Sequence, residues 1–589
     1  MRRWKPVVVT LAVVVGVVVL GGVWLAVRSQ QAADALTSAR DGVTGVREAL
    51  TDGDPGAAAA RLAVVQADTA RAVSVTSDPV FTLAGALPWV GRTPKAVTAV
   101  AASADDLATN VLSPLVDAGT TLDPQTLRLG ARQINVAALE SALPSVEQAS
   151  AGVDAALSDL SSLDLGGTPP QVQDAVTSLS DELADLDTQL ASIGSALRIL
   201  PPMLGADGPR QYLLAIQSNN EARGTGGFLG TYGVLKLDEG AITIERLAPR
   251  SFLDSQVYDT PPLDFGPDYA ALYGDQVGSW SSANLSPHYP YAARLWLKMW
   301  QDRFGERLDG VVTTDPVATS YLLDATGPTE LADGRPITGD TFVELTESTV
   351  YALIDDDVER DQYLQQIARA TLSHVLRFVG SPQGMVDALA RASGERRLLV
   401  YSADRAEEGQ LADMAVGGTL PEGPGPVAGL TIINASGNKA DYYLGQNLAY
   451  ALRSCGDQTQ QTRITVRLDN GIPRNADLPG YVIGRVDLAR PGQPVPTKGG
   501  DQRVFVQVYA AEGAALEQVR VNGRPVTAEQ GTERGRPVYR LPVVIPAAGS
   551  TTVRLDLLEP RAEGVPRTWT TPLVKPATVS ADPFVCADV

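Results

Sequence analysis

Residues 211–254 contain three segments with strand-like patterns, which restrict this part of the chain to a sheet. Residues 212–216 form a short apolar run, and residues 228–237 and 241–247 alternate between apolar and polar side chains. The tripeptide Asp238-Glu239-Gly240 between the last two segments fits a tight hairpin turn, because glycine adopts a positive φ at no steric cost. We therefore predict three strands here, the second and third joined as a hairpin.

The connection before this hairpin, residues 218–227, is polar and contains several glycines around Arg223. We predict a loop whose backbone can approach a bound group closely. Arg223 and Arg250 are the preferred ligands for an anion, because a guanidinium matches phosphate oxygens with paired hydrogen bonds. The alternative is that both form salt bridges, to carboxylates such as Glu221 and Asp254.

Residues 7–27 are an uninterrupted run of apolar residues and glycine. A run of this length is enough to cross a hydrocarbon layer of about 30 Å as one helix. Three basic residues precede the run and one follows closely, so the N-terminus is expected in the cytoplasm and the rest outside. A cleaved signal peptide is the alternative, although no clear small-residue cleavage site is present. Residues 1–28 are thus predicted to be a cytoplasmic tip and a transmembrane anchor.

Residues 29–204 are rich in alanine, with apolar residues at spacings of three and four, which predicts an extracytoplasmic helical bundle or stalk. No strict heptad repeat with flanking charges continues through it, which favours a spacer that packs on itself. A stalk that binds an envelope protein partner is the other interpretation. The predicted helices cover residues 30–52, 55–77, 95–118, 133–163 and 169–199.

Residues 205–380 interleave strands with helices, which predicts an α/β sandwich. Beyond the three strands we expect a long loop over 260–286, a strand at 308–313, and helices at 289–304, 316–325, 338–354 and 360–379.

The remaining chain changes pattern. Residues 381–460 are predicted to connect two domains, with a helix at 384–392 and strands at 397–401 and 429–433. From residue 461 to 589, alternation with Gly, Pro and Asn at the breaks predicts an all-β sandwich. Its expected strands are 462–468, 481–487, 503–509, 519–521, 538–545 and 551–557.

Net charge and cysteine content argue against two kinds of ligand, nucleic acid and zinc. The net charge of −20 argues against nucleic-acid binding, which requires a basic surface. The two cysteines, Cys455 and Cys586, lack the short spacing and the partners of a zinc site. Outside the cytoplasm they are expected to form a disulfide that ties the C-terminus to the sandwich.

Three sequence runs resemble a known family. They are SNNEARGTGGFLGTYGVLKLDEGAITI, NLSPHYP from Asn284 and LDGVVTTDPVATSYLLDATGP from Leu308, and together they resemble the actinobacterial domain-of-unknown-function 4012 family. More distantly, the order of elements is similar to the LytR-CpsA-Psr phosphotransferases, which move glycopolymers from a polyprenyl-pyrophosphate carrier onto the cell wall. Their apolar strand, loop arginine and second arginine after a proline correspond to residues 212–216, Arg223 and Arg250.

This second resemblance implies a phosphate site and magnesium. The family's arginine-rich helix start corresponds to the segment containing Arg360, which adds a third anion ligand, although Arg360 could equally be a surface charge. By residue type, Asp254, Asp259 and Asp315 are the candidate ligands for Mg²⁺, with Asp254 preferred, because phosphoryl transfer requires oxygen ligands. Asp315, followed by Pro316, equally fits a helix N-cap. The chain departs from the pattern at Thr225 and Ser251, where the phosphotransferases have aspartates, so the resemblance supports an anion site better than it supports catalysis.

Two functions are therefore expected from the sequence. In the first, the protein is a single-pass membrane protein whose extracytoplasmic part binds a polyprenyl-phosphate-linked glycan or cell-wall polymer. Whether it also transfers that polymer, as a glycopolymer phosphotransferase, stays open. In the second, it is a non-catalytic envelope scaffold with a degenerate phosphotransferase-like domain.

Overall fold

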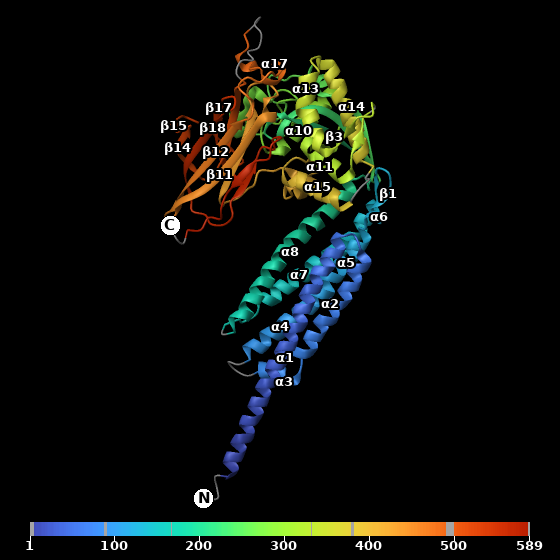
Figure 1. Ribbon diagram of the computed structural model, residues 1–589, viewed down its shortest axis with the longest axis vertical. Helices are drawn as coiled ribbons and strands as arrows, with labels where there is room; N and C mark the ends of the chain where they lie inside the picture. The colour runs from blue at the N-terminus through green and yellow to red at the C-terminus, as the bar shows by residue number, and fades with distance from the viewer. Residues whose placement is uncertain are drawn as a thin grey trace. The chain divides into compact units, whose positions relative to one another are not determined.

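The computed structural model describes residues 5–86, 91–166, 168–331, 333–377, 382–490 and 500–586, with the backbone alone for residues 5–23, 51, 124, 125, 275 and 382. The chain forms two compact units, Met1–Gly208 and Pro209–Val589. The first is helical, and the second combines an α/β domain with two further β-sheets, so the multidomain α/β architecture is confirmed (Figure 1).

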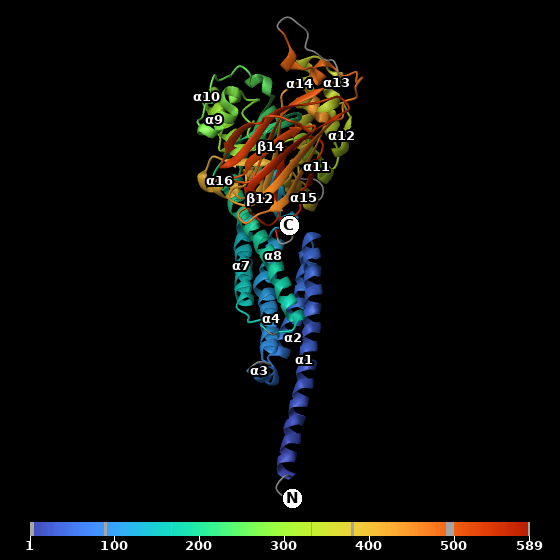
Figure 2. The ribbon, with the colours of Figure 1, turned by 90° about the vertical axis from the view of Figure 1, so that its left-hand side faces the viewer.

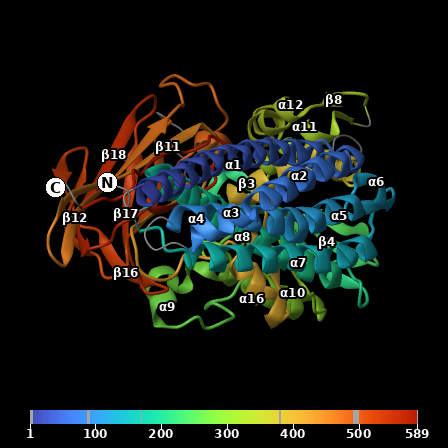
Figure 3. The same ribbon diagram turned by 90° about the horizontal axis from the view of Figure 1, so that it is seen from below.

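The first unit consists mainly of long helices. The chain's first helix, α1, is continuous from Lys5 to Thr51, so the predicted apolar span and the first bundle helix form one element. Figure 3 shows α1 and α2 running side by side. The other helices agree closely with the predicted positions, apart from a short α3 and α6 and a π-helical turn, η1. They are α2 Pro55–Thr76, α3 Pro79–Gly85, α4 Arg92–Leu107, η1 Ala108–Leu112, α5 Ser113–Thr121, α6 Pro124–Leu127, α7 Val136–Ser161 and α8 Pro170–Met203.

Local sequence explains where these helices begin. The Asp54 side chain accepts a hydrogen bond from the Ala57 N–H at 2.8 Å, and Pro55 occupies the first turn of α2. The interior is lined by small aliphatic side chains such as Ala58 and Val65, which let the helices approach closely. Two short strands, β1 Arg128–Gly130 and β2 Gln133–Ile134, pair between α6 and α7.

Most of the predicted membrane span, residues 7–27, lies within residues 5–23, for which the structure describes only the backbone. Among the described residues, no helix combines the length and the apolar character needed to cross a membrane.

The α/β part of the second unit is built on five strands in the order β5-β4-β3-β6-β9. The predicted hairpin is confirmed: β4 Gly226–Asp238 and β5 Ala241–Pro249 are antiparallel, and Glu239 and Gly240 both have positive φ, 47° and 79°. The predicted loop at 218–227 is wrong, because β3 extends from Arg210 to Arg223 and pairs with β4 as far as Gly226. β6 Gly310–Thr314 runs parallel to β3, and β9 Leu399–Ser402 is antiparallel to β6.

Helices pack on both faces of this sheet. Leu213 and Ala215 of β3 belong to the same core cluster as α10 Tyr289–Phe304. Because side chains alternate along a strand, Tyr212 and Leu214 point to the other face. The helices of that second layer include α11 Pro316–Thr326, α12 Gly339–Glu344, η4 Leu345–Thr349, α13 Val350–Leu353, α14 Asp357–Val375 and α15 Pro382–Gly394. Within the predicted loop at 260–286, residues 267–273 form a helix, α9 Pro267–Tyr273.

Two sheets form the C-terminal β-region. The first has the order β16-β17-β13-β10-β19 and the second β15-β14-β18-β12-β11-β20. Their strands are β10 Val427–Asn434, β11 Leu444–Cys455, β12 Thr459–Asn470, β13 Gln502–Tyr509, β14 Ala515–Val521, β15 Arg524–Pro525, β16 Glu529–Glu533, β17 Arg536–Ile545, β18 Ser550–Pro560, β19 Arg567–Thr570 and β20 Thr578–Ser580. The strand predicted at 481–487 is wrong: this segment contains the helix α17 Gly480–Ile483 and the turn η7 Val486–Leu488.

The α/β domain and the β-region share a core. Val427, Tyr509, Val538 and Trp569 of the β-region belong to the same buried cluster as the α10 side of the α/β sheet. Residues 381–460, expected as a connection, contribute β9 to the α/β sheet and β10 and β11 to the two others. Neither part is therefore expected to fold without the other.

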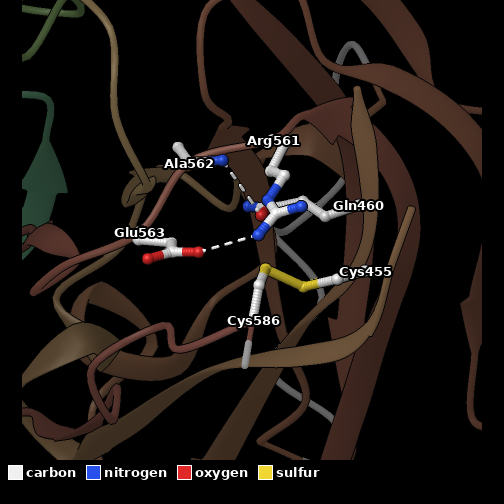
Figure 4. The surroundings of a disulfide bond; sticks show 6 residues. All are labelled: Cys455, Gln460, Arg561, Ala562, Glu563 and Cys586. Atoms are coloured by element: carbon white, nitrogen blue, oxygen red, sulfur yellow. Dashed lines mark hydrogen bonds and ion pairs between the residues drawn. A yellow bond between two sulfur atoms is a disulfide. The ribbon is translucent and has the colours of Figure 1, made fainter. Parts of the chain in front are cut away.

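The predicted disulfide is present. Cys455, the last residue of β11, is bonded to Cys586, with their Cα atoms 5.8 Å apart. Figure 4 shows the bond beside Gln460, whose side chain accepts a hydrogen bond from the Ala562 N–H at 3.1 Å. The bond ties the segment after β20 to the end of β11.

Candidate functional site

A cavity of about 110 Å³ lies between the α/β sheet and the helices of its second layer. Polar groups from β3, the segment after β5 and α14 meet aromatic and aliphatic side chains there. Its lining includes Ile216, Ser218, Phe228, Thr231, Arg250, Ser251, Phe342, Glu347, Tyr351, Arg360, Asp361, Leu364, Ile367 and Tyr481. Two of the three arginines singled out in the sequence therefore line one cavity.

Arg250 begins the short 3-10 turn η2, Arg250–Leu253, which directly follows β5. Its guanidinium pairs with Asp254 and lies 5.5 Å from the centre of the Phe228 ring. The Nε of Arg250 is buried and has no hydrogen-bond partner among the described residues. Arg250 therefore lines the cavity while its Nε is buried without a partner among the described residues.

Arg360 lies in the first turn of α14 and is 4% exposed, so it is not a surface charge. It donates to the Ile354 carbonyl at 3.1 Å and pairs with Asp357. Its guanidinium stacks 4.3 Å from the centre of the Tyr481 ring. In the cavity lining, the buried Arg360 guanidinium therefore packs against the ring of Tyr481, which belongs to α17.

Glu347 is the buried acid of the cavity, and it lies in the π-helical turn η4, an irregularity often found at functional sites. The Asn220 N–H donates to Oε2 at 2.7 Å and the Ser218 hydroxyl donates to Oε1 at 3.1 Å. Burial nevertheless raises the pKa of Glu347 to about 8. Glu347 is therefore mostly uncharged at pH 7 and does not repel an anion.

Arg223 is not among the residues that line this cavity. Its guanidinium donates to Glu221 at 2.7 Å, to the Ser281 carbonyl at 3.1 Å and to the Ala222 carbonyl at 2.9 Å. The contact with Glu221 is the salt bridge given above as the alternative to anion binding. Together these contacts give Arg223 a structural role.

The glycines around Arg223 also have an internal explanation. A Cβ on Gly224 would lie 2.2 Å from the Leu285 carbonyl oxygen, and a Cβ on Gly227 would lie 2.0 Å from the Ser218 oxygen. The protein's own backbone approaches closely here, so no bound group is needed to account for these glycines.

The residues present do not fit magnesium. Asp254 pairs with Arg250 and is absent from the cavity lining, and no cluster of three or more His, Cys, Asp or Glu suited to a metal occurs among the described residues. Thr225 is buried and accepts hydrogen bonds from Gln217 at 2.7 Å and Asn284 at 2.9 Å. Ser251 donates to Asp361 at 3.0 Å, so both positions that differ from the phosphotransferase pattern carry neutral, engaged side chains.

One wall of the cavity rests on a buried ion pair that the sequence analysis missed. The Lys439 ammonium lies 2.8 Å from Glu221 and 3.4 Å from the centre of the Phe228 ring. Burial alone would raise the pKa of Glu221, but Lys439 and Arg223 outweigh it and hold the pKa at about 2. Glu221 is therefore charged, and Lys439 connects β3 and the Phe228 wall to the β-region.

The second unit is thus an α/β domain that shares its core with a β-region and contains an arginine-lined cavity. Residues 207–351 match the family model described as a protein of unknown function, DUF4012, which supports the resemblance over these residues. No curated protein matches the chain. A solved structure from Legionella pneumophila, described as a candidate nutrient-binding protein, is similar at 9% identity and a TM-score of 0.15, over 25% of this chain and 55% of that one. This likeness carries no argument about function.

Proposed function

We propose that the second unit binds the phosphate end of a polyprenyl-phosphate-linked envelope glycan in the cavity between β3 and α14, without a metal and without turnover. The observation that carries the proposal is the convergence of Arg250 and Arg360 on one cavity that contains an uncharged Glu347. A buried guanidinium binds phosphate oxygens with charge-assisted hydrogen bonds.

The remaining lining suits the apolar end of the same ligand. Ile216, Phe342, Leu364 and Ile367 provide aliphatic and aromatic surface next to the arginines. At about 110 Å³ the cavity admits only a small group, whereas ligand pockets commonly measure about 300–1,000 Å³. Binding of a prenyl chain therefore requires the helices over the cavity to move apart.

We expect Arg250→Ala and Arg360→Ala each to weaken binding of polyprenyl pyrophosphate by about tenfold or more, because each removes charge-assisted hydrogen bonds worth about 1.5–3 kcal/mol. Arg250→Lys should recover binding only in part, since an ammonium lacks the fork geometry. The measurement is a titration of the full chain in detergent with a fluorescent polyprenyl pyrophosphate.

Arg246→Ala is the matched control. Arg246 lies on β5, the strand that ends directly before Arg250. It is half-exposed, pairs with Glu306 at 2.6 Å and is absent from the cavity lining.

Binding should also weaken as pH rises through about 8, when Glu347 ionises, and Glu347→Gln should remove that dependence. Equal affinity of the wild type and the folded Arg250→Ala variant would refute the site.

The second function, a non-catalytic scaffold, is favoured by the small size of the cavity and by the partners that Arg360 already has. It predicts no binding of polyprenyl pyrophosphate by the wild type. The same titration therefore distinguishes the two functions.

The proposal includes a membrane anchor at residues 7–27 and an extracytoplasmic second unit, on the strength of the apolar run and the basic residues before it. We expect a cysteine introduced at an exposed position such as Val565 to react with a membrane-impermeant maleimide on intact cells. The wild-type chain, whose two cysteines are disulfide-bonded, is the control. Reaction only after cell lysis would contradict this orientation.

A further inference from the structure

The six-stranded sheet of the β-region packs one face against the five-stranded sheet, and Figure 2 looks onto its other face at β12 and β14. Alternate residues of β12 are buried apolar side chains, such as Ile464 and Val466, while Arg463, Thr465 and Arg467 between them point outward. This outer face is therefore polar, and arginine is frequent on it.

Two further arginines of this outer face, Arg520 and Arg554, lie opposite each other on neighbouring strands. Arg520 of β14 is the direct partner of Arg554 of β18 in the antiparallel register. On its other side, Arg554 is opposite Thr465 of β12. Like charges directly opposite each other destabilise a sheet. The Arg520–Arg554 pair therefore lowers the stability of this sheet, so the stability of the fold does not explain why the pair is present.

In the described part of the chain, no carboxylate forms an ion pair with Arg520 or Arg554. Elsewhere on the face, Arg463 pairs with Asp556 at 2.6 Å and Arg467 with Asp469 at 2.8 Å. Within the described residues, the Arg520 side chain donates to two neutral oxygens, those of Gln518 and Gly523. The Arg554 side chain is exposed and has no hydrogen bond or ion pair among the described residues.

The absence of an ion pair at these two arginines is unexpected in such an acidic chain; the nearest acid on β18, Asp556, pairs with Arg463 instead. The protein has 68 acidic and 48 basic residues. Arg453, at the edge of the same face, is also exposed and has no carboxylate partner in the described parts of the chain. Glu517, an exposed carboxylate in the larger hollow, offsets one of these three arginines, so the face carries net positive charge on a protein of net charge −20.

The same residues line two neighbouring hollows. One, of about 610 Å³, is lined by Arg453, Gln461, Arg463, Glu517, Gln518 and Asp556, and the other, of about 250 Å³, by Arg520, Asn522, Gly523, Thr552 and Arg554. Because Gln518 and Asp556 each lie two residues from the arginine pair on the same strands, the hollows adjoin. Together they cross four strands, a width of about 14 Å at the usual strand spacing.

We propose that this face binds an acidic polysaccharide, with Arg520 and Arg554 holding its anionic groups. A hollow that crosses four strands suits a polymer better than a single ion. The amide and hydroxyl groups of Gln461, Asn522 and Thr552 supply the neutral donors and acceptors that sugar hydroxyls require. The residues described in the lining include no aromatic side chain for base stacking, which disfavours single-stranded nucleic acid.

The test is binding of the full chain to immobilised polygalacturonate, a carboxylated glycan. We expect the Arg520→Gln, Arg554→Gln double variant to bind at least about tenfold more weakly, because two charge-assisted contacts are lost. Arg467→Gln, on the same face but paired with Asp469, is the matched control and should change binding by less than about threefold. Neutral dextran should not bind.

Two further measurements separate loss of polysaccharide binding at this face from an effect on the α/β cavity and from loss of folding. Arg250→Ala should bind polygalacturonate like the wild type, because Arg250 lies in the α/β cavity. Arg554→Gln should leave the melting temperature unchanged or raise it, since it removes a repulsive pair. Wild-type binding by the double variant, no binding by the wild type, or equally tight binding of inorganic polyphosphate or single-stranded DNA would each overturn the proposal.

Discussion

Replacing Cys455 and Cys586 together with serine is expected to lower the free energy of unfolding of the second unit by about 5 kcal/mol. The bond joins residues 131 apart in sequence, so its loss releases a long closed loop in the unfolded chain. The C-terminal strand depends on it most, because β20 pairs with β11 through only three residue positions. Urea denaturation of the oxidised wild type and of the double variant measures the difference.

Reduced wild-type protein is the control, and it should denature like the serine variant. Hydrogen exchange should also show that the amides of β20 lose their protection first, while the central strand β12 keeps its own. Phe584, buried and 4.8 Å from the Tyr450 ring centre, provides some remaining attachment. A loss below about 1 kcal/mol would mean that this packing, and not the disulfide, holds the C-terminal segment.

The periodic elements of the fold could be predicted from sequence. The long helices of the first unit repeat apolar residues every three or four positions, and the α10 helix matches the prediction at 289–304. The hairpin turn at Glu239 and Gly240 follows from local turn chemistry. β11, however, was not predicted, because residues 448–452 form a short continuous apolar run, which by itself does not distinguish a strand from a helix.

The end of β3 shows how tertiary contacts can override a local pattern. Asn219 and Asn220 look like loop residues, but both are fully buried within a strand. The Asn219 amide donates to Asp315 at 2.9 Å and to the Pro572 carbonyl at 2.9 Å, and the Asn220 amide donates to the Glu347 carbonyl. These partners are about 95 to 350 residues away, so the sequence around β3 contains no sign of them.

The same limit applies to the cavity. Arg250 and Arg360 could be selected as anion ligands because each matches a motif position, whereas Arg223, selected in the same way, is held by Glu221. Tyr481 could not be found, because the helix that carries it was expected to be a strand of the sandwich. Glu347 gave no signal either, since its pKa depends on burial that only the folded chain creates.

Replacing Lys439 with methionine is expected to lower the free energy of unfolding by about 3–5 kcal/mol, because it leaves the largely buried Glu221 carboxylate with Arg223 as its remaining cationic partner among the described residues. Methionine keeps most of the side-chain volume, so the effect reports the lost charge and not a cavity. Arg246→Met is the matched control: its half-exposed pair with Glu306 is worth at most about 1 kcal/mol.

The pH dependence identifies Glu221 as the cause. In the wild type the pKa of Glu221 is held at about 2, so its contribution to stability is present above about pH 4.5 and is lost as pH falls toward 2. Without Lys439, burial raises that pKa and the folded variant gains a proton, so its deficit should shrink as pH falls below about 5. Adding Glu221→Gln should recover more than half of the loss at pH 8. If Lys439→Met costs no more than Arg246→Met, or its deficit is the same at pH 4 and pH 8, the ion pair does not support the wall of the cavity.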